Sequence, residues 1–239
     1  MEILVSIALR ILPPEIHPGG PPGAQDNSQA ELRAAVVTLG AGNRGLLFAG
    51  RLGPEKGIRT LPAGWRQARV LWRLKIAGDG SLARNVQDAA SETNTIEWVG
   101  RKTNPEVTAL MATAKLVIVP SESYDAMPCV VVEAYAEHKP VLAANIGPLS
   151  EMIIPGTTRL LFEPGNLRAL ATELEWIFQH SEQLPAEQAH NQFVAKYSPD
   201  SNYTQLCSIY SRVAAVPIDS QVAKPARLQH PESLTDDQT

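Results

Sequence analysis

The feature that most constrains the fold is a regular alternation of short apolar runs with helix-like segments along the middle of the chain. The strand-like runs carry few polar residues, as in Leu116–Val119, which reads LVIV. Strands without polar alternation are buried on both faces, as they are in a parallel sheet covered by helices. The alternation therefore predicts an α/β fold, a Rossmann-like parallel sheet with helices on both faces, in a single domain.

The expected elements follow from hydrophobic periodicity and from the Gly, Pro and Asp residues that bound it. Strands are expected at Gly45–Phe48, Arg73–Ala77, Thr95–Val99, Leu116–Val119, Pro140–Ala143 and Leu160–Phe162. Helical segments are expected at Ile58–Leu71, Ser81–Ala90, Pro105–Ala114, Val130–Glu137, Leu149–Ile153 and Leu167–Gln179. Pro62 and Gly64 weaken the first of these helices.

The two ends of the chain differ in composition from the middle. Residues 1–44 form an apolar leader followed by a Pro/Gly-rich stretch, Pro13–Gln29, which is typical of a linker that is partly disordered. Residues 214–239 are mostly polar and lack apolar periodicity, so a disordered tail is expected there. The domain itself is expected to span residues 45–213.

Composition narrows the functional classes. The net charge is −4, whereas nucleic-acid binders usually present a strongly basic face, so no nucleic-acid partner is expected. Cys129 and Cys207 are far apart and form no CxxC pair, which argues against a disulfide framework or a zinc site and favours a cytoplasmic location. The leader carries Glu2 where a signal peptide needs positive charge, and no segment reaches the roughly 20 apolar residues of a transmembrane helix.

Ligands of parallel α/β sheets bind at the carboxyl ends of the strands, so the loops after Phe48, Ala77, Val99, Val119 and Ala143 are the candidate site. The first loop, residues 49–57, reads AGRLGPEKG.

Arg51 and Lys56 lie on that glycine-rich first loop, where two cations can converge on one diphosphate. They would also stabilise the charge that grows on a nucleoside-diphosphate leaving group. The alternative is that both are surface charges, one of them paired with Glu55.

The second and third loops carry weaker signals. AGDGSL, which follows Ala77, contains glycines that let a ligand or a neighbouring backbone come close. It lacks the G-x-G-x-x-G pattern of NAD-binding domains, which argues against an NAD-dependent oxidoreductase. The third loop, Gly100-Arg101-Lys102, could meet a flat nucleobase through its backbone groups, or it could be a solvated basic turn.

The fourth loop is the most informative and leads into a helix that is expected to begin near Pro128. The backbone N–H groups of Cys129 and Val130 should therefore lie in its first turn, where free donors and the helix dipole favour a phosphate. Asp125 and Glu133 lie eight positions apart, and such carboxylates suit sugar hydroxyls. Alternatively, Asp125 caps the helix and Glu133 is solvated.

Seven segments in order carry a resemblance to a known family. The chain resembles the C-terminal, donor-binding domain of family-4 glycosyltransferases, whose GT-B fold has two facing Rossmann-like domains. The resemblance extends from Phe48 to Asn166, and the helices up to Val213 fit the closing helices of that family. The matching segments are FAGRLGPEKG, LKIAGDGSL, IEWVGR, EVTALMATAKLVIVPS, PCVVVEAYA, KPVLAANIGPLSEMI and LLFEPGN.

The resemblance implies glycosyl transfer from a UDP-, GDP- or ADP-sugar with retention of configuration and without a metal ion or other cofactor. It implies that Arg51 and Lys56 hold the donor diphosphate, that Glu133 binds the nucleotide ribose and that Asp125 contacts hydroxyls of the donor sugar. The catalytic set would be Arg51, Lys56 and Asp125. The donor-binding set would be Gly50, Arg51, Lys56, Lys102, Asp125, Ala126, Cys129, Val130 and Glu133, with Lys102 meeting the base through its backbone.

The chain departs from the family pattern at a few positions. Asp125 stands where the family has Glu, which shortens the reach of the carboxylate by one methylene. Ala126-Met127 replaces the usual Gly-Phe. His138 and Arg159 stand where glycine is common, and this matters only if a positive φ is required there.

Family members also carry an N-terminal domain that binds the acceptor, and residues 1–44 contain no βαβ run. We therefore expect a donor-binding half that acts with a separate acceptor-domain protein, cytoplasmic and peripheral to the membrane through that partner. The alternative is a non-catalytic or vestigial nucleotide-sugar-binding domain.

Overall fold

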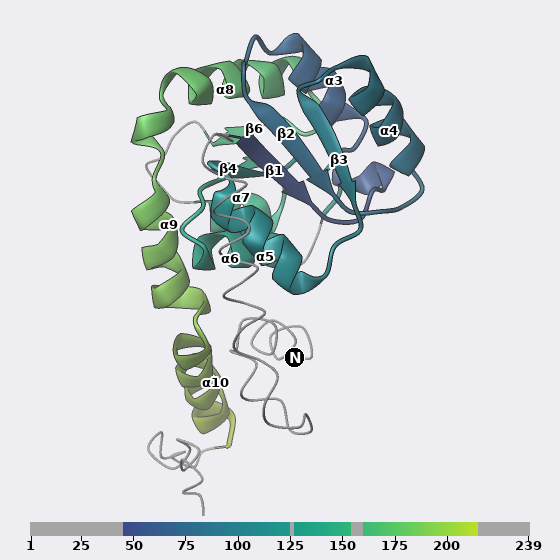
Figure 1. Cartoon of the computed structure of the whole chain (residues 1–239). Helices are drawn as coiled ribbons and strands as arrows, with labels where there is room; N and C mark the ends of the chain where they lie inside the picture. The colour runs from purple at the N-terminus through teal and green to yellow at the C-terminus, as the bar shows by residue number, and fades with distance from the viewer. Residues whose placement is uncertain (1–44, 125–126, 154–159, 215–239) are drawn as a thin grey trace, which may run out of the picture.

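The computed structural model of the chain describes residues 45–124, 127–153 and 160–214 (Figure 1). This part of the chain forms a six-stranded sheet in which every neighbouring pair is parallel, with helices around it, so the predicted α/β fold is confirmed. The strands are β1 (Gly45–Ala49), β2 (Arg73–Ala77), β3 (Ile96–Gly100), β4 (Leu116–Val119), β5 (Val141–Ala144) and β6 (Leu161–Phe162).

The order of the strands is β3-β2-β1-β4-β5-β6. The chain builds outward from β1 to β3, then returns to the middle of the sheet and adds β4 on the other side of β1. Between β1 and β4 the direction of winding reverses, so the loops after these two strands diverge and leave a crevice. Crevices of this kind, at the carboxyl ends of the strands, are where doubly wound sheets bind ligands.

Burial explains why the central strands read as uninterrupted apolar runs. All four residues of β4 and all four residues of β5 are buried. β3 lies at one edge of the sheet and only Ile96 within it is buried. The helices that cover the sheet and follow it are α3 (Thr60–Gln67), α4 (Ala83–Glu92), α5 (Asn104–Thr113), α6 (Cys129–Ala136), α7 (Pro148–Met152), α8 (Leu167–Gln179), α9 (Ala186–Gln192) and α10 (Pro199–Ala214), with short turns η2 (Pro54–Lys56), η3 (Ser181–Gln183) and η4 (Phe193–Tyr197).

The helix expected at Ile58–Leu71 is shorter at both ends. α3 spans Thr60–Gln67, and Leu71 lies beyond it with 88% of its surface exposed. Pro62 falls in the first turn, where its missing N–H is not needed. A Cβ on Gly64 would lie 2.9 Å from the Leu170 side chain of α8. The glycine that weakens the helix in the sequence therefore allows α3 and α8 to pack closely.

The C-terminus of α6 needs a left-handed residue, and the chain places a histidine there. His138 has φ +57° and is the one non-glycine residue with positive φ in the described ranges. Its N–H bonds the Tyr135 carbonyl at 3.1 Å, and the N–H of Lys139 bonds Ala134 at 2.8 Å, which is the pattern that usually ends on glycine. The His138 ring stacks on His190 of α9 with a centroid distance of 3.6 Å. The departure at Arg159 lies outside the described residues.

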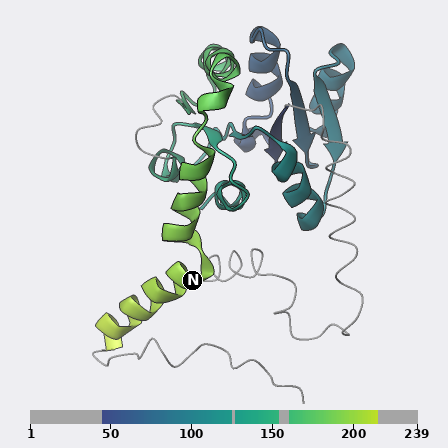
Figure 2. The ribbon, with the colours of Figure 1, turned by 60° about the vertical axis from the view of Figure 1, so that its left-hand side comes forward.

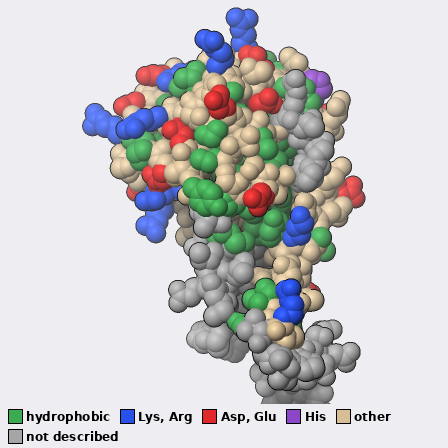
Figure 3. All heavy atoms as spheres, turned by 180° about the vertical axis from the view of Figure 1, so that it is seen from behind, with side chains coloured by type: hydrophobic (Ala, Val, Ile, Leu, Met, Phe, Trp, Pro, Cys, Tyr) green, Lys and Arg blue, Asp and Glu red, His purple; other side chains and the backbone are tan. Residues whose placement is uncertain are grey.

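α10 projects away from the sheet domain (Figures 1 and 2). No helix in the described ranges is both long enough and apolar enough to cross a membrane. On the face seen in Figure 3, cationic and acidic side chains are interspersed. Residues 1–44 and those after Ala214 lie outside the described part, so the expected leader, linker and tail remain predictions.

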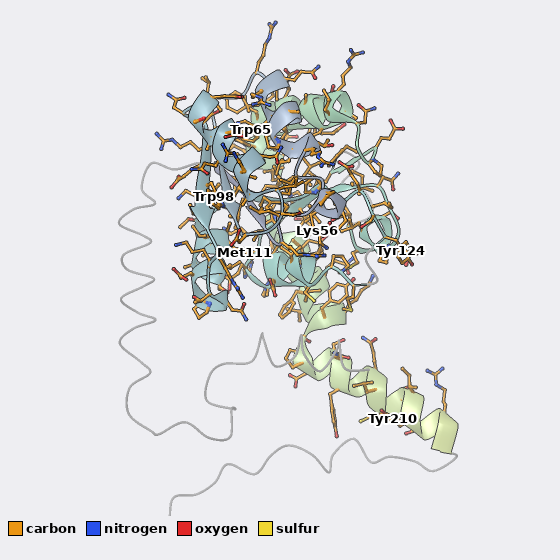
Figure 4. All side chains as sticks on the ribbon, turned by 90° about the vertical axis from the view of Figure 1, so that its right-hand side faces the viewer. Lys56, Trp65, Trp98, Met111, Tyr124 and Tyr210 are labelled. Carbon is orange, nitrogen blue, oxygen red and sulfur yellow. The ribbon has the colours of Figure 1, made fainter. Side chains whose placement is uncertain are left out.

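Removing one buried hydroxyl tests the packing of α6 on the last turn of α7. The Tyr135 hydroxyl donates to the Met152 carbonyl at 3.0 Å, and Tyr135 is 1% exposed. We expect Tyr135→Phe to lower the free energy of unfolding by about 1 kcal/mol, because a buried acceptor loses its donor. Urea unfolding measures this loss. Tyr124→Phe is the control, since Tyr124 is 71% exposed and labelled at the edge of the domain in Figure 4, and it should leave stability unchanged.

Candidate functional site

A cavity of about 620 Å³ opens at the carboxyl ends of the strands, a size typical of small-molecule sites. It lies where the strand order reverses and is lined by the loops after β1, β2, β3 and β4 and by the start of α6. The fifth candidate loop, after β5, contributes no lining residue. The cavity is lined by Phe48, Ala49, Gly50, Arg51, Lys56, Ala77, Gly78, Asp79, Arg101, Lys102, Asn104, Val107, Ile118, Val119, Ser121, Met127, Pro128, Cys129, Val130 and Glu133.

The first loop carries both predicted cations into this cavity. Lys56 is half-buried at the end of η2 and lines the cavity (Figure 4). Arg51 also lines it, and its Nη2 lies 2.6 Å from Glu55 Oε1, with the Arg51 side chain 70% exposed. The ion pair considered as an alternative for Arg51 is therefore present. Exposed pairs of this kind contribute about 0–1 kcal/mol, so the guanidinium can exchange Glu55 for a stronger anion at little cost.

Backbone hydrogen bonds hold the first and second loops together. Gly50 N–H donates to Ala77 at 3.0 Å, and Leu52 N–H donates to Asp79 at 2.9 Å. A Cβ on Gly78 would overlap the carbonyl oxygen of Gly50, so this glycine accommodates a neighbouring backbone. The indole N–H of Trp98, labelled in Figure 4, donates to the Gly78 carbonyl at 3.0 Å. The second loop thus serves mainly to support the first.

The third loop is anchored to the start of α5. Lys102 Nζ lies 3.4 Å from Glu106 Oε1, and Glu106 Oε2 accepts from the Thr103 N–H at 2.8 Å. The Thr103 backbone N–H, then its hydroxyl, and Lys102 hold the pKa of Glu106 below its usual value. The Lys102 side chain is therefore paired with the first turn of α5, and Lys102 also lines the cavity.

The first turn of α6 faces the cavity through Cys129 and Val130, as predicted, and Glu133 follows one turn later. The Val131 N–H bonds the Pro128 carbonyl at 3.0 Å. First-turn N–H groups have no acceptor within their own helix, and the helix dipole is positive there, so this wall favours a phosphate. Asp125 and Ala126 lie outside the described residues, and their roles remain predictions.

The charges of the cavity wall are mostly positive although the whole chain carries −4. The lining residues in the described ranges include four cations and two carboxylates. A cavity of this kind suits a ligand that combines a polyanion with hydroxyl groups. No group of three or more acidic, His or Cys side chains in the described ranges could hold a metal ion. The cations are Arg51, Lys56, Arg101 and Lys102, and the carboxylates are Asp79 and Glu133.

Seven of the nine predicted donor-binding residues therefore line one cavity, and the other two lie outside the described part. Sequence reasoning missed Asp79, Arg101, Asn104 and Ser121 as lining residues, although each follows the end of a strand. Ser121 is a buried polar residue, only 3% exposed, and it lines the cavity from the loop after β4. The available signal was their place in the segments after β2, β3 and β4, with Asn104 at the start of α5.

Comparison with known proteins shows which family the sequence matches. Residues 43–180 match the family model described as Glycosyl transferases group 1. The lipopolysaccharide 1,2-N-acetylglucosaminetransferase of Salmonella typhimurium is 33% identical over 190 residues, which is 73% of this chain and 48% of that protein.

Solved structures agree on the fold. Sucrose-phosphate synthase from Thermosynechococcus elongatus superposes with a TM-score of 0.67 at 25% identity, covering 78% of this chain and 49% of that one. Anabaena HepE in complex with UDP superposes with a TM-score of 0.64 at 22% identity, covering 79% of this chain and 54% of that one. The chain thus spans about half the length of the relatives it matches.

Proposed function

Since the chain belongs to the group 1 glycosyl transferase family, we propose that its described domain binds a nucleoside-diphospho-sugar and presents it for glycosyl transfer. The observation that carries this proposal is the convergence of Lys56, the first turn of α6 and Glu133 on one cavity. A cation and helix N–H groups recognise a diphosphate, and a carboxylate recognises vicinal hydroxyls. One nucleotide sugar offers both.

In this proposal Arg51 and Lys56 hold the diphosphate and stabilise the charge that develops on the leaving nucleoside diphosphate. Glu133 accepts hydrogen bonds from the ribose hydroxyls, and Asp125 contacts the donor sugar. The backbone at Lys102 meets the base, and Gly50 gives the phosphates close access to the first loop. No metal ion takes part, because the cations and the helix N-terminus neutralise the diphosphate. We assign the domain to family 4, with retention of configuration.

Transfer also needs an acceptor, and the chain spans about half the length of the relatives it matches. We propose that an acceptor-binding half completes the site and sets any association with a membrane. Binding measurements can determine whether the nucleotide of the donor is UDP, GDP or ADP. Isothermal titration of the chain with the three nucleotides and their glucose conjugates should give saturable binding of one series. Absence of binding in all three series would overturn the proposal.

A second candidate is a domain that binds the donor but does not transfer it. Asp125 in place of glutamate favours this reading, because a carboxylate one methylene shorter reaches less far into the donor sugar. Turnover of the donor distinguishes the two candidate functions. Release of free sugar or its transfer from a radiolabelled donor supports an enzyme, whereas tight binding without turnover, even with the acceptor half supplied, supports a binding domain.

Lys56→Ala separates the phosphate role from the rest of the site. We expect the variant to bind the preferred nucleoside diphosphate about 1–3 kcal/mol more weakly, the usual scale for a hydrogen bond with a charged partner. Binding of the matching nucleoside should change little. Titration of both ligands checks this, with Lys115→Ala as the control, since Lys115 pairs with Glu182 outside the cavity wall. Equal losses for both ligands would argue against a phosphate contact.

A further inference from the structure

A side-chain bond between distant parts of the chain joins α3 to the loop after β4. Thr60 Oγ1 donates to Glu122 Oε1 at 2.5 Å, across 62 positions of sequence. Thr60 is 8% exposed, one of two buried polar residues in the described ranges, with Ser121. Because Thr60 is buried, its side chain has little freedom to rotate. Its hydroxyl therefore fixes the orientation of the Glu122 carboxylate.

The same loop is tied to the loop that carries the cations. Glu122 N–H donates to the Glu55 carbonyl at 2.9 Å, and Ser123 Oγ donates to the same oxygen at 3.5 Å. Lys56 follows Glu55 directly, and Ser121 lines the cavity beside it. We call this set of contacts, from Thr60 through Glu122 to Glu55, the loop clamp. The loop clamp joins the loop after β1 to the loop after β4. The first of these loops carries Lys56, the predicted diphosphate-binding cation, and the second leads into α6.

We propose that Glu122 is a positioning residue for the donor site, and this rests on the function proposed above. Held by Thr60, its side chain keeps the loop after β4 at a set distance from Lys56, so that the cation and the first turn of α6 can bind one diphosphate together. Without the Thr60 hydroxyl, the carboxylate is free to rotate. The distance between the loop after β4 and Lys56 is then no longer fixed. The Glu122 carboxylate can also turn toward the cations that are proposed to bind phosphate.

The test compares variants by isothermal titration with UDP, GDP and ADP and with the three matching nucleosides. We expect Thr60→Val to weaken binding of the preferred diphosphate about three- to tenfold, the effect of losing one net hydrogen bond, and to leave nucleoside binding unchanged. Thr60→Ser restores the hydroxyl and should restore affinity. Glu122→Gln keeps an acceptor oxygen and should bind nearly as the unchanged chain does, whereas Glu122→Ala should behave like Thr60→Val.

Thr95→Val is the matched control. Its hydroxyl accepts from the Trp65 indole at 3.2 Å and bonds the Thr93 hydroxyl at 2.9 Å. Thr95 directly precedes β3, at the opposite end of the sheet from the cavity, so the same chemical change removes side-chain bonds away from the site. It should lower the melting temperature without changing the ratio of diphosphate to nucleoside affinity. Should Thr60→Val fold poorly, Glu122→Ala gives the same comparison at an exposed residue.

The outcomes separate the two proposals. If the unchanged chain binds no nucleotide, the proposed function itself fails. If it binds, but Glu122→Ala and Thr60→Val keep full diphosphate affinity or lose nucleoside affinity equally, the loop clamp has no positioning role and this inference is overturned.

Discussion

Gly57→Ala is expected to destabilise the domain by about 3–5 kcal/mol, the largest single effect predicted for this chain. Gly57 has φ +68°, a left-handed conformation that costs an L-residue about 1–2 kcal/mol. A Cβ at this position would also overlap the carbonyl oxygen of Pro120, which belongs to the backbone and cannot rotate away. The loop after β4 must shift for the alanine to fit.

Comparison of Gly57→Ala with Gly100→Ala separates the steric part of the destabilisation from the conformational part. Gly100 has φ +72°, close to the value at Gly57, but nothing lies within 4 Å of the Cβ position. This variant should cost only about 1–2 kcal/mol, the conformational part. Urea unfolding of both variants, followed by far-UV circular dichroism, measures the difference. Equal losses would mean that the fourth loop accommodates a Cβ at position 57 without a steric cost.

The same contact links stability to binding. Gly57 follows Lys56 and touches the loop that carries Ser121 to the cavity wall. A shift of that loop would widen the space between the cation and α6, so the folded fraction of Gly57→Ala should bind nucleoside diphosphate more weakly. Gly100→Ala, on the third loop, should leave diphosphate binding unchanged.

Glu133→Ala is expected to weaken nucleotide binding by about 1–3 kcal/mol, because the ribose loses a hydrogen bond to a charged acceptor. Glu133 is half-buried on α6 and lines the cavity one turn after Cys129 and Val130, whose N–H groups are proposed to bind phosphate. Nucleoside and nucleoside diphosphate should lose affinity alike, since both contain the ribose. This contrasts with Lys56→Ala, which should affect only the diphosphate.

Titration with the preferred nucleotide and with its 2′-deoxy analogue checks the assignment. The unchanged chain should distinguish the two ligands, and Glu133→Ala should bind both equally. Glu137→Ala is the control on the same helix, because Glu137 caps its far end outside the cavity wall. An unchanged affinity in Glu133→Ala would mean that the ribose contact is wrongly assigned.

Local pattern alone determined several elements. The predicted strands Arg73–Ala77 and Leu116–Val119 and the predicted helix Leu167–Gln179 have the bounds that the structure gives them. Each is set by its own periodicity and by the Gly, Pro or Asn residues at its ends, which act within a few positions of sequence. The location of the site also followed, because parallel strands bring their carboxyl ends to one edge of the sheet whatever their order.

Other features depend on which segments meet in space, and no local pattern contains that information. Gly64 weakens a helix by its propensity, but in the structure it allows α3 to pack closely on α8. The sequence left open whether Gly78 makes room for a ligand or for a neighbouring backbone, and the structure places the Gly50 backbone there. His138 takes a left-handed conformation at a position where the family it resembles commonly has glycine.

The sequence alone therefore determined the fold class and the family resemblance, because these depend on short-range spacing. It also named seven residues that line the candidate cavity. The tertiary structure decided the strand order and the crevice between β1 and β4. It also decided the pairing of Arg51 with Glu55 and the bond from Thr60 to Glu122. The last of these joins residues 62 positions apart, and such contacts form only when the sheet has assembled and brought its loops to one edge.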